Sequence, residues 1–325
     1  MLRVLQAGGD LQRAGRPGLI YHGCVSIRIL VARHSAFYSP LIAAIGGGFL
    51  ERHGLAATYG VLAAGQSSSG AIREGRADVI QSAVSSSWLQ MEKGAADLPV
   101  HFAQINQRDG FFLTARPGGG AFEYRALEGR TLLADHAPQP MAMLRYALDR
   151  QGVDWNRVRV ADAGTPAGID AAFRAGRGEY AHQQGPAPQQ LEHEGRGTVV
   201  ASIGEAMPPV AFSSLTASRD FLATGPARDF LRAYREARQW VQTAAAAEVA
   251  GAVGTFFPET DPAALRAAIE RYQRFGCWAG GLEITRKLYE QALEVFLADG
   301  SITRRHRYED VVAPAPLEQN RSARR

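Results

Sequence analysis

Serine and glutamine side chains gather in two segments that follow expected strands. The first segment is Gln66–Ser69 and the second is Ser85–Ser87. Small hydroxyl groups let a ligand come close to the chain and offer it hydrogen bonds, and the helix that follows adds the positive end of its dipole. Capping that helix needs only one serine, so the surplus favours a binding loop, with ordinary capping as the alternative. From these segments we take as candidate ligand-binding residues Gln66, Ser67, Ser68, Ser85 and Ser86.

The segment His34–Tyr38 has the same setting. It lies between an apolar strand and a helix that Ser39 would cap and Pro40 would begin. Exposed backbone N–H groups at such a helix start favour an anion or a carbonyl group. Phe37 or Tyr38 could stack on a planar ligand, and the alternative is that one of the two rings belongs to the core. Further candidates are therefore His34, Phe37 and Tyr38.

Four more candidates lie near other strand ends. Arg108 could hold an anionic ligand with its guanidinium fork, or form a surface pair with Asp109. His136 precedes a helix and could donate to the ligand, or cap that helix in solvent. Gln183 ends a strand and could face a cleft, or simply be solvated. Phe212, together with the other rings, indicates a ligand with a compact ring or an organic part.

A repeated pattern of strand, loop and helix positions these segments. Expected strands cover Ile27–Ala32, Ala77–Val84 and Val100–Gln107, with helices between them. A second series of the same kind runs from 131 to 203, and the chain is helical after Ala227. Such alternation predicts parallel sheets with right-handed crossovers, on which ligands bind at the carboxyl ends of the strands.

Length and charge set limits on the function. A chain of 325 residues is too long for one modest core and fits two lobes. The formal net charge is +4, lysine occurs only at Lys93 and Lys287, and the arginines are scattered, often beside acidic residues. This pattern indicates a solvated surface and argues against a nucleic-acid partner.

Metal and cofactor chemistry lacks support in the sequence. Cys24 and Cys277 stand far apart without metal-binding spacing, and the histidines show no HxH, HxxxH or HExxH pattern. The serines lack a GxSxG elbow, which argues against nucleophilic catalysis. We therefore expect no catalytic residue, no metal site and no cofactor.

Six short motifs follow one another along the chain. They are Phe37–Pro40, Gly48–Leu55, Gly65–Ser69, Ala71–Val79, Leu127–Thr131 and Leu297–Ile302. Their order and spacing together resemble one family, the substrate-binding proteins of ABC importers for nitrate, sulfonates, taurine and thiamine precursors. The likeness runs from about residue 27 to residue 312.

The resemblance implies an α/β, two-lobed periplasmic-binding-protein-like (type II) fold with a ligand cleft between the lobes and a helical C-terminal segment. Two strands would cross between the lobes, which would close around the ligand by a hinge motion. The first lobe is expected from residues 25–116 and 218–312, and the second from 117–217. The flanking segments 1–24 and 313–325 are rich in glycine, proline and charge, which predicts a disordered leader and tail.

The expected function is that of a solute receptor, a monomer that closes on a small anionic or heteroaromatic ligand and delivers it to an ABC permease. Ligands of the sulfonate, nitrate and thiamine-precursor types all stay open. The resemblance implies the periplasm, whereas segment 1–24 shows no apolar core typical of a secretory signal. A cytosolic ligand sensor is therefore kept as an alternative, and the localisation is left open.

An enzyme on the same scaffold is the other alternative, because thiamine-pyrimidine synthases are similar to this family. The resemblance assigns those enzymes a lysine that carries pyridoxal phosphate, an iron site and a cysteine-rich motif. Here Lys93 would lie late on a short helix and Lys287 on a C-terminal helix, and there is no cysteine cluster. These departures favour the receptor over the enzyme.

Overall fold

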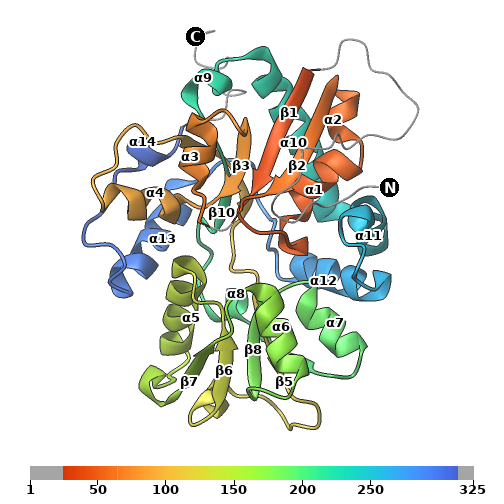
Figure 1. Ribbon diagram of the computed structural model, residues 1–325, viewed down its shortest axis with the longest axis vertical. Coiled ribbons are helices and arrows are strands. Elements are labelled where there is room, and N and C mark those ends of the chain that lie inside the picture. The colour runs from red at the N-terminus through yellow and green to blue at the C-terminus, as the bar shows by residue number, and fades with distance from the viewer. Residues whose placement is uncertain (1–24, 64, 314–325) are drawn as a thin grey trace.

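Apolar strands assemble into two five-stranded sheets, one in each lobe of an α/β protein (Figure 1). This computed structural model describes residues 25–63 and 65–313. The expected leader, 1–24, and residues 314–325 of the expected tail lie outside the described residues. Ala313 is described and buried, and its backbone N–H donates to the His101 carbonyl at 2.9 Å. Among the described helices, none combines the length and the hydropathy that crossing a membrane requires.

The first sheet has the strand order β2-β1-β3-β10-β4. Strands β1, β2 and β3 are parallel, whereas β10 runs antiparallel to β3 and β4. Leu30 packs on Ala71 and Ile72 in a cluster separate from that of Ile29, so the two faces of β1 are covered by different helices. The strands are β1 (Val25–Val31), β2 (Leu55–Val61), β3 (Val79–Ser82), β4 (Val100–Asn106) and β10 (Ser213–Ala217).

The second sheet has the strand order β7-β6-β8-β5-β9. Strand β6 is parallel to β7 and β8, and β5 runs antiparallel to β8 and β9. Each sheet thus holds one antiparallel strand, and that strand is the one next to a crossing between the lobes. The strands are β5 (Phe111–Ala115), β6 (Thr131–Ala134), β7 (Arg159–Asp162), β8 (Tyr180–Gln184) and β9 (Thr198–Ser202).

Helices follow the strands as the sequence pattern predicts, and several begin at a capping side chain. Thr165, Thr224 and Thr285 each accept a hydrogen bond from the first turn of the helix that follows. Before the second crossing the helices are η1 (Ala36–Tyr38), α1 (Ser39–Gly46), α2 (Phe49–Arg52), α3 (Ser68–Arg73), α4 (Val84–Met91), η2 (Tyr124–Leu127), α5 (Pro138–Arg150), η3 (Trp155–Arg157), α6 (Pro166–Arg174), α7 (Ala187–His193) and α8 (Ile203–Ala206).

The C-terminal part of the described chain is helical, as expected, and packs on both lobes. Helix α10 buries an apolar stripe at Phe230, Leu231, Tyr234 and Val241, while Trp240 is half-buried with its ring 5.6 Å from that of Phe49. This helix contacts α1 and α2. The helices are α9 (Arg219–Leu222), α10 (Gly225–Thr243), α11 (Ala246–Val253), η4 (Gly254–Phe256), α12 (Pro262–Arg274), α13 (Arg286–Ala298) and α14 (Tyr308–Val311).

Strands β5 and β10 each pair in the opposite sheet from the one that the sequence predicts. Strand β5 was assigned to the first lobe but pairs in the second sheet, and β10 was assigned to the second lobe but pairs in the first. The chain changes lobe just before β5, where the buried carboxyl group of Asp109 accepts from the Phe111 N–H at 2.6 Å. We propose that the lobes divide within 107–110 and 203–212.

One buried hydroxyl joins the first crossing between the lobes to the residue that follows β8. The hydroxyl of Tyr272, on α12, accepts from the Gly185 N–H at 2.7 Å and donates to the Gly110 carbonyl at 2.9 Å. A Cβ on Gly110 would lie 2.2 Å from the ring of Phe37, so only glycine fits there. Burial raises the pKa of Tyr272 well above its ordinary value, which keeps this hydroxyl protonated.

The lobes also touch on both sides of this junction. On one side Arg271 pairs with Glu192 at 2.8 Å, and the Asp261 N–H donates to Gln190 at 2.8 Å. On the other side Arg145 of α5 pairs with Asp299 at 3.2 Å. Contacts on two sides indicate that the structure represents a closed arrangement of the lobes.

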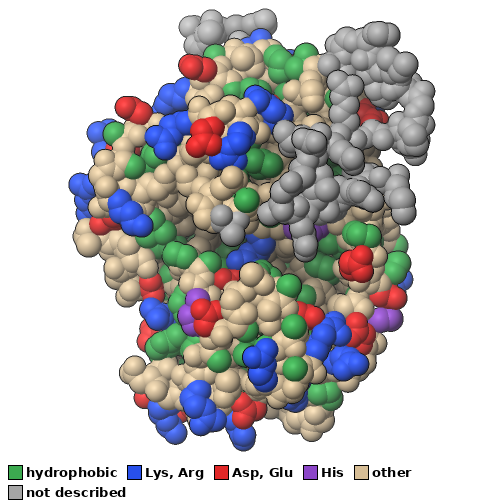
Figure 2. Space-filling view, in the orientation of Figure 1, with side chains coloured by type: hydrophobic (Ala, Val, Ile, Leu, Met, Phe, Trp, Pro, Cys, Tyr) green, Lys and Arg blue, Asp and Glu red, His purple; other side chains and the backbone are tan. Residues whose placement is uncertain are grey.

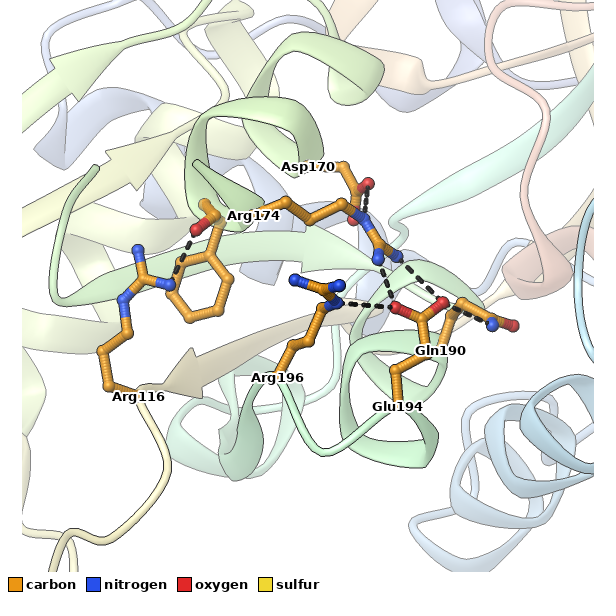
Figure 3. A network of polar contacts seen from close by, with 7 residues as sticks. Arg116, Asp170, Arg174, Gln190, Glu194 and Arg196 are labelled. Carbon is orange, nitrogen blue, oxygen red and sulfur yellow. Dashed lines mark hydrogen bonds and ion pairs between the residues drawn. The ribbon is translucent and has the colours of Figure 1, made fainter. Parts of the chain in front are cut away.

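Arginine side chains pair with carboxylates over both lobes, and Figure 2 shows basic groups lying among acidic ones. Figure 3 shows one such network in the second lobe, where Arg174 reaches Asp170 on its own helix and Glu194 at the end of α7. Arg196 also approaches Glu194, at 3.5 Å. This network ties α6 to α7.

Arg116 stands beside this network and holds the end of β5. Its guanidinium lies 3.8 Å from the ring centroid of Phe173 and donates to the Phe173 carbonyl at 2.7 Å. It also donates to the carbonyls of Arg177 and Gly178 at 2.8–3.1 Å. Four hydrogen bonds from one charged group close the loop that precedes β8.

We expect Arg116→Met to lower the free energy of unfolding by about 2 kcal/mol, because hydrogen bonds from a charged donor are worth more than neutral ones. Arg130→Met is the matched control, since Arg130 is exposed and only approaches Glu179 at 3.8 Å. That change should cost less than about 0.5 kcal/mol. Chemical unfolding of both variants measures the difference, and equal losses would contradict the role given to Arg116.

His101 lies buried in the first sheet and joins β4 to α4 and β10. Its Nε2 lies 3.0 Å from the Ser87 hydroxyl, and its Nδ1 lies 2.7 Å from that of Ser214 and 2.9 Å from that of Thr216. Burial lowers the pKa of His101 to about 3. The folded protein therefore keeps this imidazole neutral where the unfolded chain binds a proton.

The free energy of unfolding should fall as the pH drops from about 6.5 toward 3. In this range His101 binds a proton in the unfolded chain but stays neutral in the folded protein. One such group contributes a slope of about 1.4 kcal/mol per pH unit. We expect His101→Gln to reduce the proton uptake on unfolding by about one between pH 4 and 6. Above pH 7 the two proteins should differ by a constant amount. Denaturant titrations of both proteins across this pH range measure the free energy of unfolding. If its pH dependence at low pH is the same in both proteins, the prediction is wrong.

Candidate functional site

A cavity of about 250 Å³ lies where the carboxyl ends of the parallel strands of both sheets face each other. Its hydroxyl groups come from Tyr38, Ser68, Ser82, Ser85, Ser86 and Ser213, and its amide groups from Gln81, Gln139 and Gln184. Larger apolar side chains come from Leu89, Phe111, Pro138, Pro140 and Phe212. Among the described residues that line it, Arg33 is the charged one.

The first lobe supplies the hydroxyl-rich wall through the ends of β1 and β3. Gln81 is 3% exposed, and its Oε1 accepts from the Ala32 N–H at 3.1 Å, which fixes the end of β1 against β3. The Ser82 hydroxyl donates to that of Ser86 at 3.1 Å. The serines expected in a loop at 85–87 lie in the first turn of α4 instead, because the strand passes into the helix directly at Ala83.

The second lobe supplies two glutamines that face this wall. Gln139, in the first turn of α5, accepts from the Ser85 hydroxyl at 3.1 Å and donates to the Phe212 carbonyl at 2.8 Å. Gln184 ends β8 and is 9% exposed, and its Oε1 has no hydrogen-bond partner among the described residues. Gln139 thus connects the two lobes at the cavity. Gln184, which also lines the cavity, has an Oε1 acceptor without a partner among the described residues.

Arg33, the charged residue of the described lining, lies beside Phe111. Arg33 pairs with Asp135 of the second lobe, and its guanidinium carbon lies 5.7 Å from the ring centroid of Phe111. His182 stacks on the other side of that ring, with centroids 4.3 Å apart. Burial, assisted by the positive charge of Arg33, lowers the pKa of His182 to about 3, so this imidazole is neutral at physiological pH.

Two further groups around the cavity stay protonated. Burial raises the pKa of Tyr38, an effect offset in part by Arg33 and by hydrogen bonds with Gln184 and Ser213. Burial also raises the pKa of Asp109 to about 8, although its bond from Phe111 opposes this. Hydroxyl and amide groups therefore dominate the polar lining of the site.

Five of the twelve candidate residues line the cavity. Tyr38 and Phe212 are 3% exposed and offer ring faces, and the hydroxyls of Ser68, Ser85 and Ser86 complete the set. Their part in binding stays a proposal, but the structure brings them together as the strand-end argument expects.

Two candidates from the early part of the chain lie elsewhere. His34 lies 2.8 Å from both the Tyr59 hydroxyl and the Phe256 carbonyl and stacks on Phe257 at 4.5 Å, because its side chain turns toward η4. Burial lowers its pKa. Phe37 is fully buried against Tyr38 and Tyr272, which makes it a core residue.

The remaining five candidates also lie outside the cavity lining. Ser67 caps α3 and Gln66 accepts from Arg76 at 3.0 Å, both on the exposed side of their turn. Arg108 donates to the Gly204 carbonyl at 2.9 Å rather than pairing with Asp109. His136 is exposed and lies 3.6 Å from Asp162. Gln183 is buried, but it lies next in β8 to Gln184 and so points to the opposite face of the sheet.

The sequence reasoning missed Arg33, Gln81, Phe111, Gln139 and Gln184, which the structure places at the cavity. The signal for each was present, because all stand at a strand end or in the first turn of a helix. Choosing Gln184 over Gln183 depends on which face of β8 turns toward the cavity. Both neighbours are glutamine, so alternation of polarity does not show it.

Known proteins of the same fold include binding proteins and an enzyme. The alkanesulfonate-binding protein SsuA from Xanthomonas axonopodis pv. citri, bound to MOPS, matches with a TM-score of 0.68 and 16% identity over 91% of this chain and 100% of that one. The nitrate-binding protein NrtA from Synechocystis PCC 6803 matches at 0.64 and 14%, over 93% and 89%. The desulfurization enzyme DSZB matches at 0.64 and 13%, over 92% and 100%.

Sequence comparison places the chain more closely. "Putative binding protein YtlA" of Bacillus subtilis (strain 168) is 27% identical over 290 residues, which cover 88% of this chain and 87% of YtlA. The family model described as NMT1/THI5 like matches residues 36–245, a span that contains the end of β3, both crossings and the whole second sheet. The chain therefore belongs to the NMT1/THI5-like family.

Proposed function

We propose that this protein is a solute-binding receptor that closes its two lobes around a small polar molecule and delivers it to an ABC permease. The observation that carries the proposal is the cavity of about 250 Å³ whose polar lining comes from both lobes. Gln139 bonds across it to Ser85 and Phe212, so closure of the lobes shapes the site. A molecule held there touches both lobes and therefore stabilises the closed arrangement.

The lining suits the ligand classes that the relatives suggest, which are a small anion or a heteroaromatic compound. The rings of Tyr38, Phe111 and Phe212 offer faces for a planar group, and the serines and glutamines offer hydrogen bonds around its edge. The names of SsuA and NrtA point to sulfonate and nitrate, and the family description fits a thiamine-precursor ligand. We further propose that the receptor acts as a monomer.

Binding without turnover is our proposal because the groups that the related enzymes would use lie away from the cavity. Lys93 and Lys287 are exposed and are not among the lining residues. Cys277 is buried against Asn106, and burial raises its pKa, which disfavours a reactive thiolate. The likeness to DSZB shows that the fold alone does not decide this point.

Mass spectrometry of the molecule that co-purifies with the native protein, followed by a thermal-shift series of sulfonates, nitrate and pyrimidines, tests the receptor proposal. A true ligand at a hundred times its dissociation constant should stabilise the fold by about 2.7 kcal/mol. The same molecule should be recovered unchanged after prolonged incubation. Formation of a product from it would replace the receptor with an enzyme.

We expect Gln184→Ala to weaken binding of the identified ligand at least tenfold, because it removes an amide that faces the cavity. The matched control is Gln66→Ala, which removes an exposed amide that accepts from Arg76 outside the lining. Binding by the control should stay within twofold of the unaltered protein in a calorimetric titration. Equal losses in both variants would place the site elsewhere.

A further inference from the structure

The charge of the cavity is balanced from within the protein. Arg33, after β1, reaches across the cavity and pairs with Asp135, which follows β6 in the second lobe. The Arg33 side chain is 22% exposed and that of Asp135 is 6% exposed. The other carboxylate oxygen of Asp135 accepts from the Ala137 N–H at 2.9 Å, so the acid is fixed at the start of α5.

An anionic solute would have to compete with this built-in counter-ion. If it took Arg33 for itself, it would leave the buried Asp135 carboxylate without its cation, which is a far larger loss than breaking an exposed pair. If it joined the pair, two negative groups would share one guanidinium at short range. An uncharged solute leaves the pair intact and meets neither cost.

A second observation, the unpaired acceptor of Gln184, also favours an uncharged ligand. Gln184 lines the cavity, and its Oε1 atom is buried without a hydrogen-bond partner among the described residues. A buried amide oxygen needs a donor, and leaving it unpaired disfavours the complex. Nitrate and sulfonate groups carry acceptors only. They could use the serine hydroxyls and the amide N–H groups, but they could not satisfy this oxygen.

We propose that the Arg33–Asp135 pair makes this site selective for a net-uncharged solute that carries a hydrogen-bond donor, and against anions that carry acceptors only. The inference rests on the proposed receptor function and narrows its ligand class. Arg33 and Asp135 are then specificity-determining residues, since they set which charge the closed cavity accepts. The pair also spans the lobes, so the same contact that excludes anions supports closure.

A matched pair of probes separates charge from shape. Benzenesulfonamide and benzenesulfonate have nearly the same size, but the first is uncharged and carries an N–H donor. Calorimetric titration should show that the unaltered protein binds the sulfonamide at least tenfold more tightly. Asp135→Asn keeps the acceptor for Ala137 and frees Arg33, so it should tighten sulfonate binding at least tenfold. The double variant that adds Arg33→Gln should lose that gain.

Asp299→Asn is the matched control, because Asp299 also forms an ion pair between the lobes, with Arg145, and does not line the cavity. It should leave the order of the two probes unchanged. If Asp135→Asn fails to fold, Asp135→Ser tests the same point, because its hydroxyl can also accept from Ala137. Thermal unfolding of each variant confirms that it is folded.

The proposal is overturned if the unaltered protein prefers the sulfonate, or if removing the Asp135 carboxylate leaves sulfonate binding unchanged or undetected. Either result would leave the receptor function standing, without charge selection by the Arg33–Asp135 pair. If the probes behave as expected but the co-purifying molecule is converted to a product, the charge selection holds and the receptor function fails. The two proposals are therefore tested separately.

Discussion

The hydroxyl of Tyr272 determines how the two lobes meet, and the candidate site depends on it. Its two hydrogen-bond partners, Gly110 and Gly185, stand next in sequence to Phe111 and Gln184, which line the cavity. Its ring also packs 5.3 Å from that of Phe37, the neighbour of Tyr38. One buried side chain therefore sets the position of three cavity residues from three separate segments, and protonation at every physiological pH keeps that junction constant.

The order of the elements follows from the sequence because it depends on local patterns. Alternating apolar strands, caps such as Thr165 and the buried stripe of α10 are each decided within a few residues. What local patterns do not decide is which sheet a strand joins. Strand β5 reads as part of the first lobe, yet the chain changes lobe just before it, and only contacts between distant segments distinguish the two.

In the candidate site, too, local sequence patterns predict some features and leave others undecided. Strand ends and helix starts identify where the ligand should lie, and five chosen residues reach the cavity. The direction of a side chain is harder to foresee, since His34 turns to Phe257 and the choice between Gln183 and Gln184 depends on strand parity. Arg33 was missed because its importance comes from Asp135, a residue about a hundred positions away that local spacing does not connect to it.

The antiparallel strand β10 has a consequence for the order in which the lobes form during synthesis. It lies between β3 and β4, so the first sheet is interrupted until residues 213–217 have left the ribosome. The second sheet is built from 111–202, which emerge earlier and form a continuous stretch. The second lobe is therefore the first that can complete its sheet, while β3 and β4 wait for β10 to pair between them.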